Sequence, residues 1–265
     1  MAGRLSSLFQ AQDMTVGSPT RNLIRFSVPL LIGNMAQQLY STVDSIVVGN
    51  YVGDSALAAI GASGPVINLL LVLFMGVSVG ASVMASQYFG AKERDSLSQT
   101  IGTTITATLA CTIFVMILGP IITRPVMSML DTPQDIFDMA CDYMLILFLG
   151  FIGSAFYNVI SGVLRGLGDS IMPLVFLLTA CILNIGLDIW FVAGFKMGVA
   201  GAAWATIVSQ FISGVLCMVR LLKMREHFTV TLRTLWPKAV FVKRLCKLGL
   251  PSGLTQAIFS LAMIV

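Results

Sequence analysis

Two polar residues stand four positions apart inside a long apolar run. Asn184 and Asp188 lie within Ile171–Phe195, which is long enough, at about 1.5 Å per residue, to cross a bilayer as a helix. An Asp in such a helix costs roughly 2.5–3.5 kcal/mol on insertion scales, so it indicates function by default. The spacing puts both side chains on one face, where they could bind a cation. The alternative is an Asp that neighbouring helices satisfy and that only holds the bundle together.

A second intramembrane Asp occurs in the first apolar run. Asn34, Gln37, Ser41 and Asp44 follow one another at intervals of three, four and three, so they form a stripe on one helical face. Pro29 precedes this stripe and is expected to kink or loosen the helix near its start. Asp44 carries the same insertion cost as the first Asp, so the same argument applies to it.

Other runs also carry polar or small residues at helical spacing. Shorter polar stripes in the fourth and sixth runs consist of Ser154, Asn158, Ser161, Thr206, Gln210 and Ser213. Such stripes often serve only helix–helix hydrogen bonding, which is the favoured interpretation for the fourth run. In the second run, Gly76 and Gly80 predict a face that packs closely against another helix.

The composition indicates an integral membrane protein. Apolar residues make up 57% of the chain and charged residues 11%, with a mean hydropathy of +0.91, whereas soluble domains carry roughly 25% charged residues. The five cysteines are scattered, and the single His227 leaves no His-based metal motif. The net charge of +4 does not indicate a nucleic-acid partner, because the distribution of the basic residues has a membrane explanation. We also expect no enzyme activity and no cofactor.

Seven apolar runs predict membrane helices. They are Leu23–Val48, Ala56–Met84, Leu97–Ile122, Tyr143–Leu164, Ile171–Phe195, Val199–Leu222 and Leu248–Val265. Lipid offers the backbone no hydrogen-bond partners, so these runs should be helical despite their many Val, Ile and Thr residues. The first six are long enough to span, whereas the seventh stops in mid-helix, which indicates a fragment of a longer transporter.

The basic residues predict an orientation. Fourteen of the sixteen Lys and Arg residues lie before or at the start of the first run, or at the ends of the second, fourth and sixth runs and in the connections that follow them. Only Arg124 and Lys196 fall elsewhere. The positive-inside rule therefore puts the N-terminus and those connections in the cytoplasm. We expect a multi-pass protein of the cytoplasmic membrane that contacts the lipid bilayer and is monomeric at full length.

The polar connection after the sixth run divides the chain. Residues 1–22 are interpreted as a cytoplasmic N-terminal segment, 23–222 as a six-helix transmembrane lobe, 223–247 as a cytoplasmic inter-lobe linker, and 248–265 as the truncated start of a second lobe. Arg25 to Pro29 can be laid over Lys247 to Pro251, and each precedes an apolar helix. Parallel repeats of about six helices are a known transporter plan, so the match favours two lobes.

The orientation also places three polar groups at one depth. Asp44 and Asp188 each lie a turn or two below the outer surface, and Thr206 begins the returning sixth helix at a similar height. This convergence predicts a cation site that is open to the outside. The cation is left undecided, because oxygen ligands suit Na⁺ and desolvated carboxyls suit H⁺.

A glycine-containing loop joins the fourth and fifth runs. Arg165, Gly166, Gly168 and Asp169 predict a tight cytoplasmic turn, held by an Arg–Asp salt bridge and by hydrogen bonds to the backbone. Gly-x-Gly-Asp also occurs in intramembrane aspartyl proteases, which pair two membrane Asp residues. That alternative is disfavoured, since Asp169 sits at a polar boundary beside Arg165 and no Pro-Ala-Leu follows.

Together these segments resemble the MATE (multidrug and toxic compound extrusion) antiporters, over nearly the whole chain. The most specific parts are Ser161 to Asp169 with Pro173, Leu183-Asn184 to Asp188, Gly198 to Thr206, and Pro29 with Asp44 before Gly49. The family has twelve helices in two six-helix lobes around a central cleft. The resemblance implies an all-α integral membrane protein, with a six-helix transmembrane lobe plus a truncated seventh helix, as half of a two-lobe twelve-helix transporter.

The resemblance also implies a site and a function. In family members that keep the coupling site in this lobe, the cation binds at positions that match Asp44, Asn184, Asp188 and Thr206. The residues assigned to the substrate cleft or its gating are Pro29, Asn34, Gln37, Ser41, Asn158 and Gln210. Pro29 matches the proline at which the first helix is proposed to bend on protonation. The implied function is Na⁺- or H⁺-coupled export of organic, often cationic, drugs and toxic compounds.

A flippase for lipid-linked saccharides is the alternative with the same general architecture. Such a protein would favour Arg and Lys in its cleft to bind phosphates. The membrane-embedded charges of this chain are acidic, so the antiporter is preferred.

Overall fold

The computed structural model describes residues 19–224, 226 and 228–262, which are almost wholly helical. The helices are α2 (Pro19–Tyr51), α3 (Asp54–Gly90), α4 (Arg94–Met129), α5 (Gln134–Leu149), α6 (Phe151–Gly166), α7 (Ile171–Asp188), the π-helix η1 (Ile189–Gly194), α8 (Gly198–Lys223), α9 (Leu232–Leu235) and α10 (Ala239–Ala262). α10 thus begins within the stretch interpreted as a linker. Arg4 and most of the predicted N-terminal segment lie outside the described residues.

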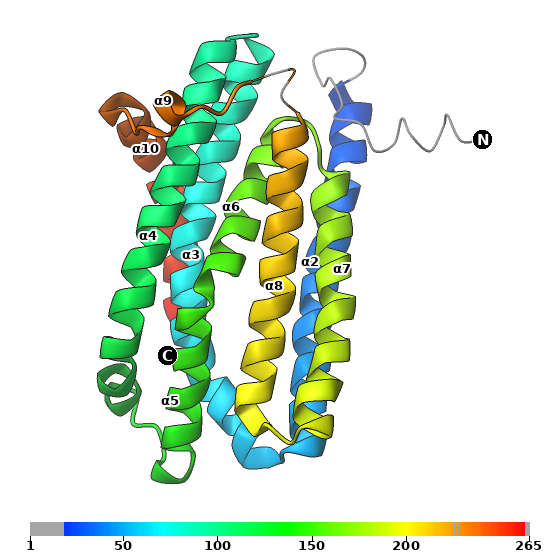
Figure 1. The fold of residues 1–265 in the computed structure, drawn as a ribbon, viewed down its shortest axis with the longest axis vertical. Coiled ribbons are helices and arrows are strands. Elements are labelled where there is room, and N and C mark those ends of the chain that lie inside the picture. Colours follow the sequence, from blue (N-terminus) through cyan, green and yellow to red (C-terminus); the bar gives the residue numbers. More distant parts are fainter. Residues whose placement is uncertain (1–18, 225, 227, 263–265) are drawn as a thin grey trace, which may run out of the picture.

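The long helices pack side by side as one bundle (Figure 1). α6 contacts both α3 and α8, and α7 contacts both α2 and α8. The α3–α4 turn, the α6–α7 turn and the end of α8 lie at one end of the bundle, and they carry the clustered basic residues. The end of α4 and the η1–α8 turn, which carry Arg124 and Lys196, lie at the other end. The structure therefore separates the charges as the sequence predicted.

Length and composition make four described segments able to cross a membrane: α3, α4, α7 with η1, and α8. α5 and α6 make a fifth span if they are taken together, although they meet at a bend of 53°. The sequence predicted one helix over Tyr143–Leu164, whereas the chain breaks at Gly150. A Cβ at Gly150 would collide with the Ile207 side chain of α8, so the glycine allows α8 to pack against the break.

α2 differs from the other predicted spans. Its 33 residues are long enough, but it is not among the described helices that are apolar enough to qualify by composition. The polar stripe from Asn34 to Asp44 lowers its mean hydropathy. α2 runs as one helix through Pro29. Asp44, at the end of its polar stripe, is buried, whereas Asn34, Gln37 and Ser41 are exposed.

Small residues bring α3 and α10 into close contact. A Cβ on Gly80 would lie 2.6 Å from the carbonyl oxygen of Leu245, and a Cβ on Gly76 would lie 3.0 Å from that of Gly249. Any larger side chain at these positions would push the two helices apart. The prediction of a close-packing face at Gly76 and Gly80 is confirmed.

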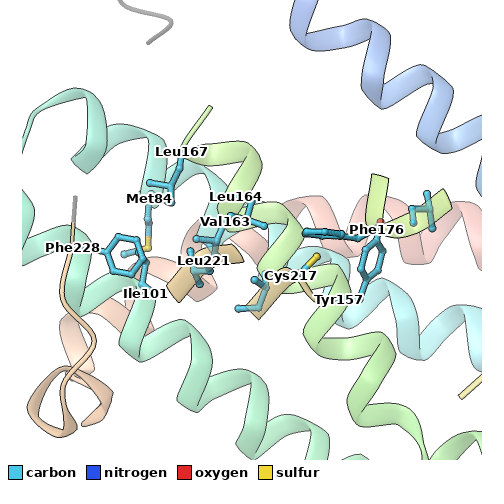
Figure 2. Packing of buried hydrophobic residues seen from close by; sticks show 14 of the residues in the cluster. Met84, Ile101, Tyr157, Val163, Leu164, Leu167, Phe176, Cys217, Leu221 and Phe228 are labelled. Atoms are coloured by element: carbon cyan, nitrogen blue, oxygen red, sulfur yellow. The ribbon is translucent and has the colours of Figure 1, made fainter. Parts of the chain in front are cut away.

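The largest cluster of buried apolar residues in the described part of the chain joins α3, α4, α6, α7 and α8 (Figure 2). Met84 of α3, Ile101 of α4, Leu164 of α6 and Leu221 of α8 pack there and are almost fully buried. Phe228, which follows α8, is also completely buried in this cluster. The chain beyond α8 is therefore anchored to the bundle before it reaches α9.

Candidate functional site

The bundle contains a cavity of about 790 Å³, lined by residues of α2, α3, α5, α6, α7 and α8. All the residues that the sequence assigned to the cleft or its gating line it, namely Pro29, Asn34, Gln37, Ser41, Asn158 and Gln210. Asp44 and Thr206 also line it. Because the stripes of α2, α6 and α8 share this cavity, the three helices bring their polar faces to one space.

The two intramembrane acids meet at the edge of this cavity. Asp44 retains 8% of its surface exposed, whereas Asn184 and Asp188 are completely buried and do not line the cavity. The Asp44 and Asp188 carboxyls are close enough to interact electrostatically with each other. Asp44 is therefore the member of the pair that faces the cavity.

The polar atoms around the acid pair lack hydrogen-bond partners. Among the described residues, the buried atoms without one include Asp44 Oδ1, both carboxyl oxygens of Asp188, both amide atoms of Asn184, and Gln210 Oε1. Buried polar atoms are nearly always paired, and an uncompensated buried charge costs several kcal/mol. Such a cluster calls for a proton, a cation or water to complete it.

Two tyrosines that the sequence analysis missed complete the surroundings of the acids. The Tyr40 hydroxyl donates a 3.2 Å hydrogen bond to Thr206 Oγ1, which joins α2 to α8. Tyr143 of α5 is buried and interacts electrostatically with both Asp44 and Asp188. Tyr40 stands four residues before Asp44, so the helical spacing already contained a signal for it. Tyr143 had no such signal, because its place depends on how α5 packs.

The backbone after Asp188 is also unusual. The π-helix η1 begins at Ile189, directly after the acid, and the Phe195 amide donates to the Trp190 carbonyl. π-Helices are rare and occur often at functional sites. Trp190 and Phe195 are more than half exposed near the end of the bundle and stack on Phe191, a composition typical of membrane interfaces.

The donors at this site are two carboxyls, an amide and a hydroxyl. The described residues include no cluster of three or more His, Cys, Asp or Glu side chains suited to a metal ion. Oxygen donors with at most two negative charges suit a proton or a monovalent cation better than a tightly held transition metal. Asn184 lies one helical turn before Asp188, and Thr206 is linked to the acids through Tyr40, which bonds to Thr206 and interacts electrostatically with both of them.

The serine stripes of α6 and α8 serve helix packing as well as the cavity. Ser213 Oγ donates a 3.1 Å hydrogen bond to the Phe176 carbonyl of α7. Ser78 Oγ of α3 donates a 2.8 Å hydrogen bond to the Asn158 carbonyl, which Ser161 Oγ also approaches at 3.0 Å. Ser213 therefore joins two helices, whereas Ser161 Oγ bonds within its own helix, so the bonds described do not bear out the helix–helix interpretation of the α6 stripe.

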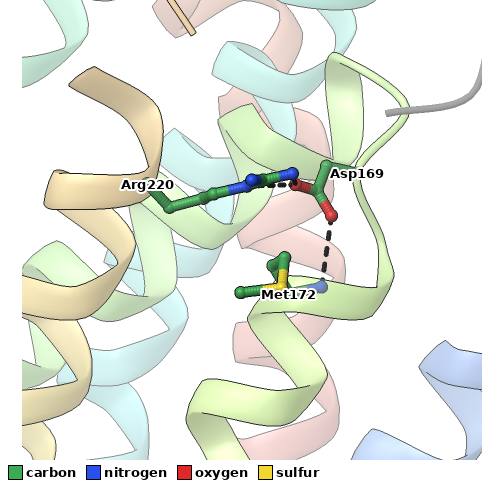
Figure 3. A network of polar contacts seen from close by, with 3 residues as sticks. All are labelled: Asp169, Met172 and Arg220. Carbon is green, nitrogen blue, oxygen red and sulfur yellow. Dashed lines mark hydrogen bonds and ion pairs between the residues drawn. The ribbon is translucent and has the colours of Figure 1, made fainter. Parts of the chain in front are cut away.

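The α6–α7 loop corrects one prediction (Figure 3). Asp169 was expected to pair with Arg165, but its Oδ2 instead accepts bonds of 2.8 Å from Nε and Nη2 of Arg220, at the end of α8. Its Oδ1 accepts from the Met172 amide in the first turn of α7, at 3.1 Å. The tight turn itself is present: Gly168 has a φ of +86°, and the Asp169 amide donates to the Leu164 carbonyl.

Arg165 takes a different place. It is partly buried, lines the cavity and interacts electrostatically with Tyr157 and Cys217. No ion pair among the described residues joins it to an acid. Gly166 packs against the backbone of Ser82, with 2.5 Å between its hypothetical Cβ and the Ser82 carbonyl oxygen. An aspartyl protease pairs two Asp residues. The described contacts of Asp169 are with Arg220 and Met172 and include no second acid, so they give no support to a protease.

Comparison with known proteins identifies relatives of this chain. A family model described as MatE matches residues 29–190. The chain is 31% identical over 261 residues to the probable multidrug resistance protein YoeA of Bacillus subtilis, and 30% identical over 252 residues to the probable multidrug resistance protein YpnP of the same organism. These alignments cover 96% and 95% of this chain but 56% of each relative, so the chain spans about half their length.

Solved structures of similar transporters also match nearly the whole of this chain with about half of their own length. The chain superimposes on the outward-facing structure of a multidrug resistance MATE family transporter with a TM-score of 0.87 and 29% identity, covering 93% of this chain and 55% of that one. A MOP superfamily transporter from Pyrococcus furiosus gives a TM-score of 0.86 at 29% identity, with the same coverage.

Proposed function

Because this chain belongs to the MatE family, whose full name is multidrug and toxic compound extrusion, we propose that it forms one lobe of a cation-coupled antiporter that exports organic, often cationic, compounds. The observation that carries the proposal is the buried contact between Asp44 and Asp188, surrounded by polar atoms without partners. The relatives are named multidrug resistance proteins, which supports organic compounds as substrates.

The electrostatics of the pair explain why it would couple transport to a cation. Two adjacent carboxyls in a buried site repel each other strongly if both are ionised, because water screens them poorly. Na⁺ or H⁺ entering from the cavity removes that repulsion. Asp44 meets the cation first, and Asp188 with Asn184 supplies the buried ligands behind it. Thr206, held by Tyr40, adds a neutral oxygen.

The same acid would act on the substrate. Asp44 is the one acidic residue among those that line the cavity, and Arg165, at the α6–α7 end, also lines it. An ionised Asp44 therefore attracts a cationic solute to its own part of the cavity. Cation binding at the pair neutralises Asp44, and the solute is then held less tightly. Coupling also requires that the occupied pair favours one conformation of the transporter, since a ligand that binds both states equally shifts neither.

The energy available is adequate for export. One cation moving inward through about 100 mV releases about 2.3 kcal/mol. That energy supports a solute gradient of roughly fiftyfold, at about 1.4 kcal/mol per factor of ten. We further propose a place in the cytoplasmic membrane with the N-terminus inside, supported by the clustering of basic residues at one end of the bundle.

Transport by the full-length protein tests this proposal. The purified protein is reconstituted into liposomes that contain ethidium, and Na⁺ and pH gradients are imposed separately. One of the gradients should drive ethidium movement, and the Asp44→Asn/Asp188→Asn variant should not respond to either. Asp54→Asn is the matched control, because this exposed acid begins α3 and lines no part of the cavity. Gradient-driven movement at the control rate in the double variant would refute the coupling role.

A further inference from the structure

The connector between α8 and α10 is bound to the flank of α4. We define the connector as residues 228–243, which include α9 and the first turn of α10. Gln99 Nε2 donates hydrogen bonds to the carbonyl oxygens of Thr234, at 3.2 Å, and Trp236, at 2.9 Å. Thr106 Oγ1 donates a 2.6 Å hydrogen bond to the Leu235 carbonyl. The carbonyls at the end of α9 therefore receive their hydrogen bonds from α4 side chains.

Shape complementarity reinforces these hydrogen bonds. A Cβ on Gly102 would collide with the carbonyl group of Thr234, so a glycine is needed where the connector crosses α4. Ser98 Oγ accepts a 3.0 Å hydrogen bond from the Thr229 amide, and Phe228 is completely buried in the main cluster (Figure 2). The connector is thus seated on the bundle along its length and is not a free tether.

The opposite side of the connector is apolar and unusually exposed. Leu232 is 89% exposed, Trp236 78% and Val240 75%. These residues follow one another at intervals of four. Large apolar side chains that point away from a seated backbone indicate a surface that meets something other than water.

The positive charge of the connector indicates which surroundings this exposed apolar surface meets. Arg233, Lys238 and Lys243 are exposed in the same segment, and residues 228–262 include no Asp or Glu. Interleaved basic and apolar residues, with a Trp among them, are typical of segments that lie in the headgroup region of a membrane. The acidic lipids of the cytoplasmic leaflet are complementary to this charge.

The depth of the connector agrees with that surface. It binds α4 between Ser98 and Thr106, within the first turns after Arg94 and where the apolar run of α4 begins (Figure 1). Near this boundary water is scarce, which explains why protein side chains satisfy the α9 carbonyls. In the proposed orientation this is the cytoplasmic interface.

We propose that the connector is an interfacial anchor that binds anionic phospholipid. Leu232, Trp236 and Val240 enter the acyl–headgroup boundary, while Arg233, Lys238 and Lys243 contact lipid phosphates. The connector would thereby hold the junction between the two lobes at a fixed depth. The inference rests on the proposed orientation but not on the coupling role of the acids.

Lipid binding by the delipidated full-length protein tests the anchor. Native mass spectrometry measures retention of phosphatidylglycerol and of phosphatidylcholine by the wild type and by Arg233→Gln/Lys238→Gln/Lys243→Gln. The wild type should prefer phosphatidylglycerol, and the triple variant should bind it roughly tenfold or more weakly. The control variant, Lys92→Gln/Lys196→Gln/Lys223→Gln, removes as many charges away from the connector and should keep the preference. Equal elution and melting in detergent verify that all three proteins are folded.

A second measurement tests the apolar contact. Brominated phosphatidylglycerol in liposomes should quench part of the tryptophan fluorescence of the wild type, and Trp236→Phe should remove a quenched component. If the second half of the full-length protein covers the connector instead, Trp236→Phe will leave the quenched fraction unchanged and the triple variant will retain phosphatidylglycerol like the control. Either result overturns the anchor, and neither depends on whether transport is coupled to Na⁺ or H⁺.

Discussion

Two acids of this bundle are almost equally buried and yet have opposite surroundings. Asp188 is 0% exposed and Asp169 is 2% exposed. Asp169 bonds to the Arg220 guanidinium and the Met172 amide, whereas neither carboxyl oxygen of Asp188 has a hydrogen-bond donor. Burial alone therefore does not distinguish a structural acid from a functional one. In the proposed mechanism the presence or absence of partners makes the difference, because an acid without partners leaves room for an exchangeable cation.

The strongest test of this comparison is removal of the unsatisfied charge. Asp188→Asn should reduce gradient-driven ethidium export by the full-length protein to background, a loss on the order of a hundredfold, because the cation loses a ligand. Its thermal melting in detergent should not fall, since a buried charge without partners is removed. If the variant exports ethidium near the wild-type rate, or loses much of its thermal stability, Asp188 has a structural role like that of Asp169.

Asp169, which has hydrogen-bond partners, should respond in the opposite way: its substitution should lower stability but leave transport in place. Asp169→Asn leaves the Arg220 guanidinium without its carboxylate and should lower the free energy of unfolding by about 2–3 kcal/mol. This is less than the loss expected for a fully buried ion pair, because the Arg220 side chain is 25% exposed and water partly screens its charge. Thermal melting of the detergent-solubilised protein measures this, with Asp135→Asn at an exposed position as the control. Any protein that survives reconstitution should still transport; complete loss of coupling in folded protein would contradict the comparison.

A smaller effect is expected at the hydrogen bond that holds Thr206. Tyr40→Phe removes the donor to Thr206 Oγ1 and should weaken the apparent affinity for the coupling cation by two- to tenfold, the range of a single neutral hydrogen bond. The concentration of Na⁺ or H⁺ that gives half-maximal export measures this change. Tyr51→Phe, in the same helix but 61% exposed, should have no effect. Identical values for the two variants would remove Tyr40 from the site.

The smallest effect should come from an ion pair without burial. Arg124 Nη2 lies 3.0 Å from Asp138 Oδ1, with the two side chains 70% and 79% exposed. Arg124→Gln should change the free energy of unfolding by less than about 0.5 kcal/mol, because water and salt screen the pair. Melting curves at low and high salt provide the measurement. A change as large as that of Asp169→Asn would show that burial does not set the strength of ion pairs here.

Much of the architecture could be predicted because membrane helices have a local signal. Within the described residues the apolar runs lie almost wholly in helices, and the glycines of α3 formed the expected close contact with α10. The break at Gly150 could not be predicted, since the apolar pattern of Tyr143–Leu164 is continuous across it. The space around Gly150 is filled by the side chain of Ile207, which belongs to another helix, so the packing at the break depends on a residue far away in the sequence.

The sequence by itself determined which faces of the helices are polar, because residues three and four apart share a face whatever the helix packs against. That was enough to put Asn34 to Asp44 on one stripe and Asn184 beside Asp188. Only the tertiary structure decided that Asp44 lies near enough to Asp188 to interact with it and that Asp169 pairs with Arg220, 51 residues away. Such partners depend on the relative positions of whole helices, which packing against distant residues decides and local spacing does not encode.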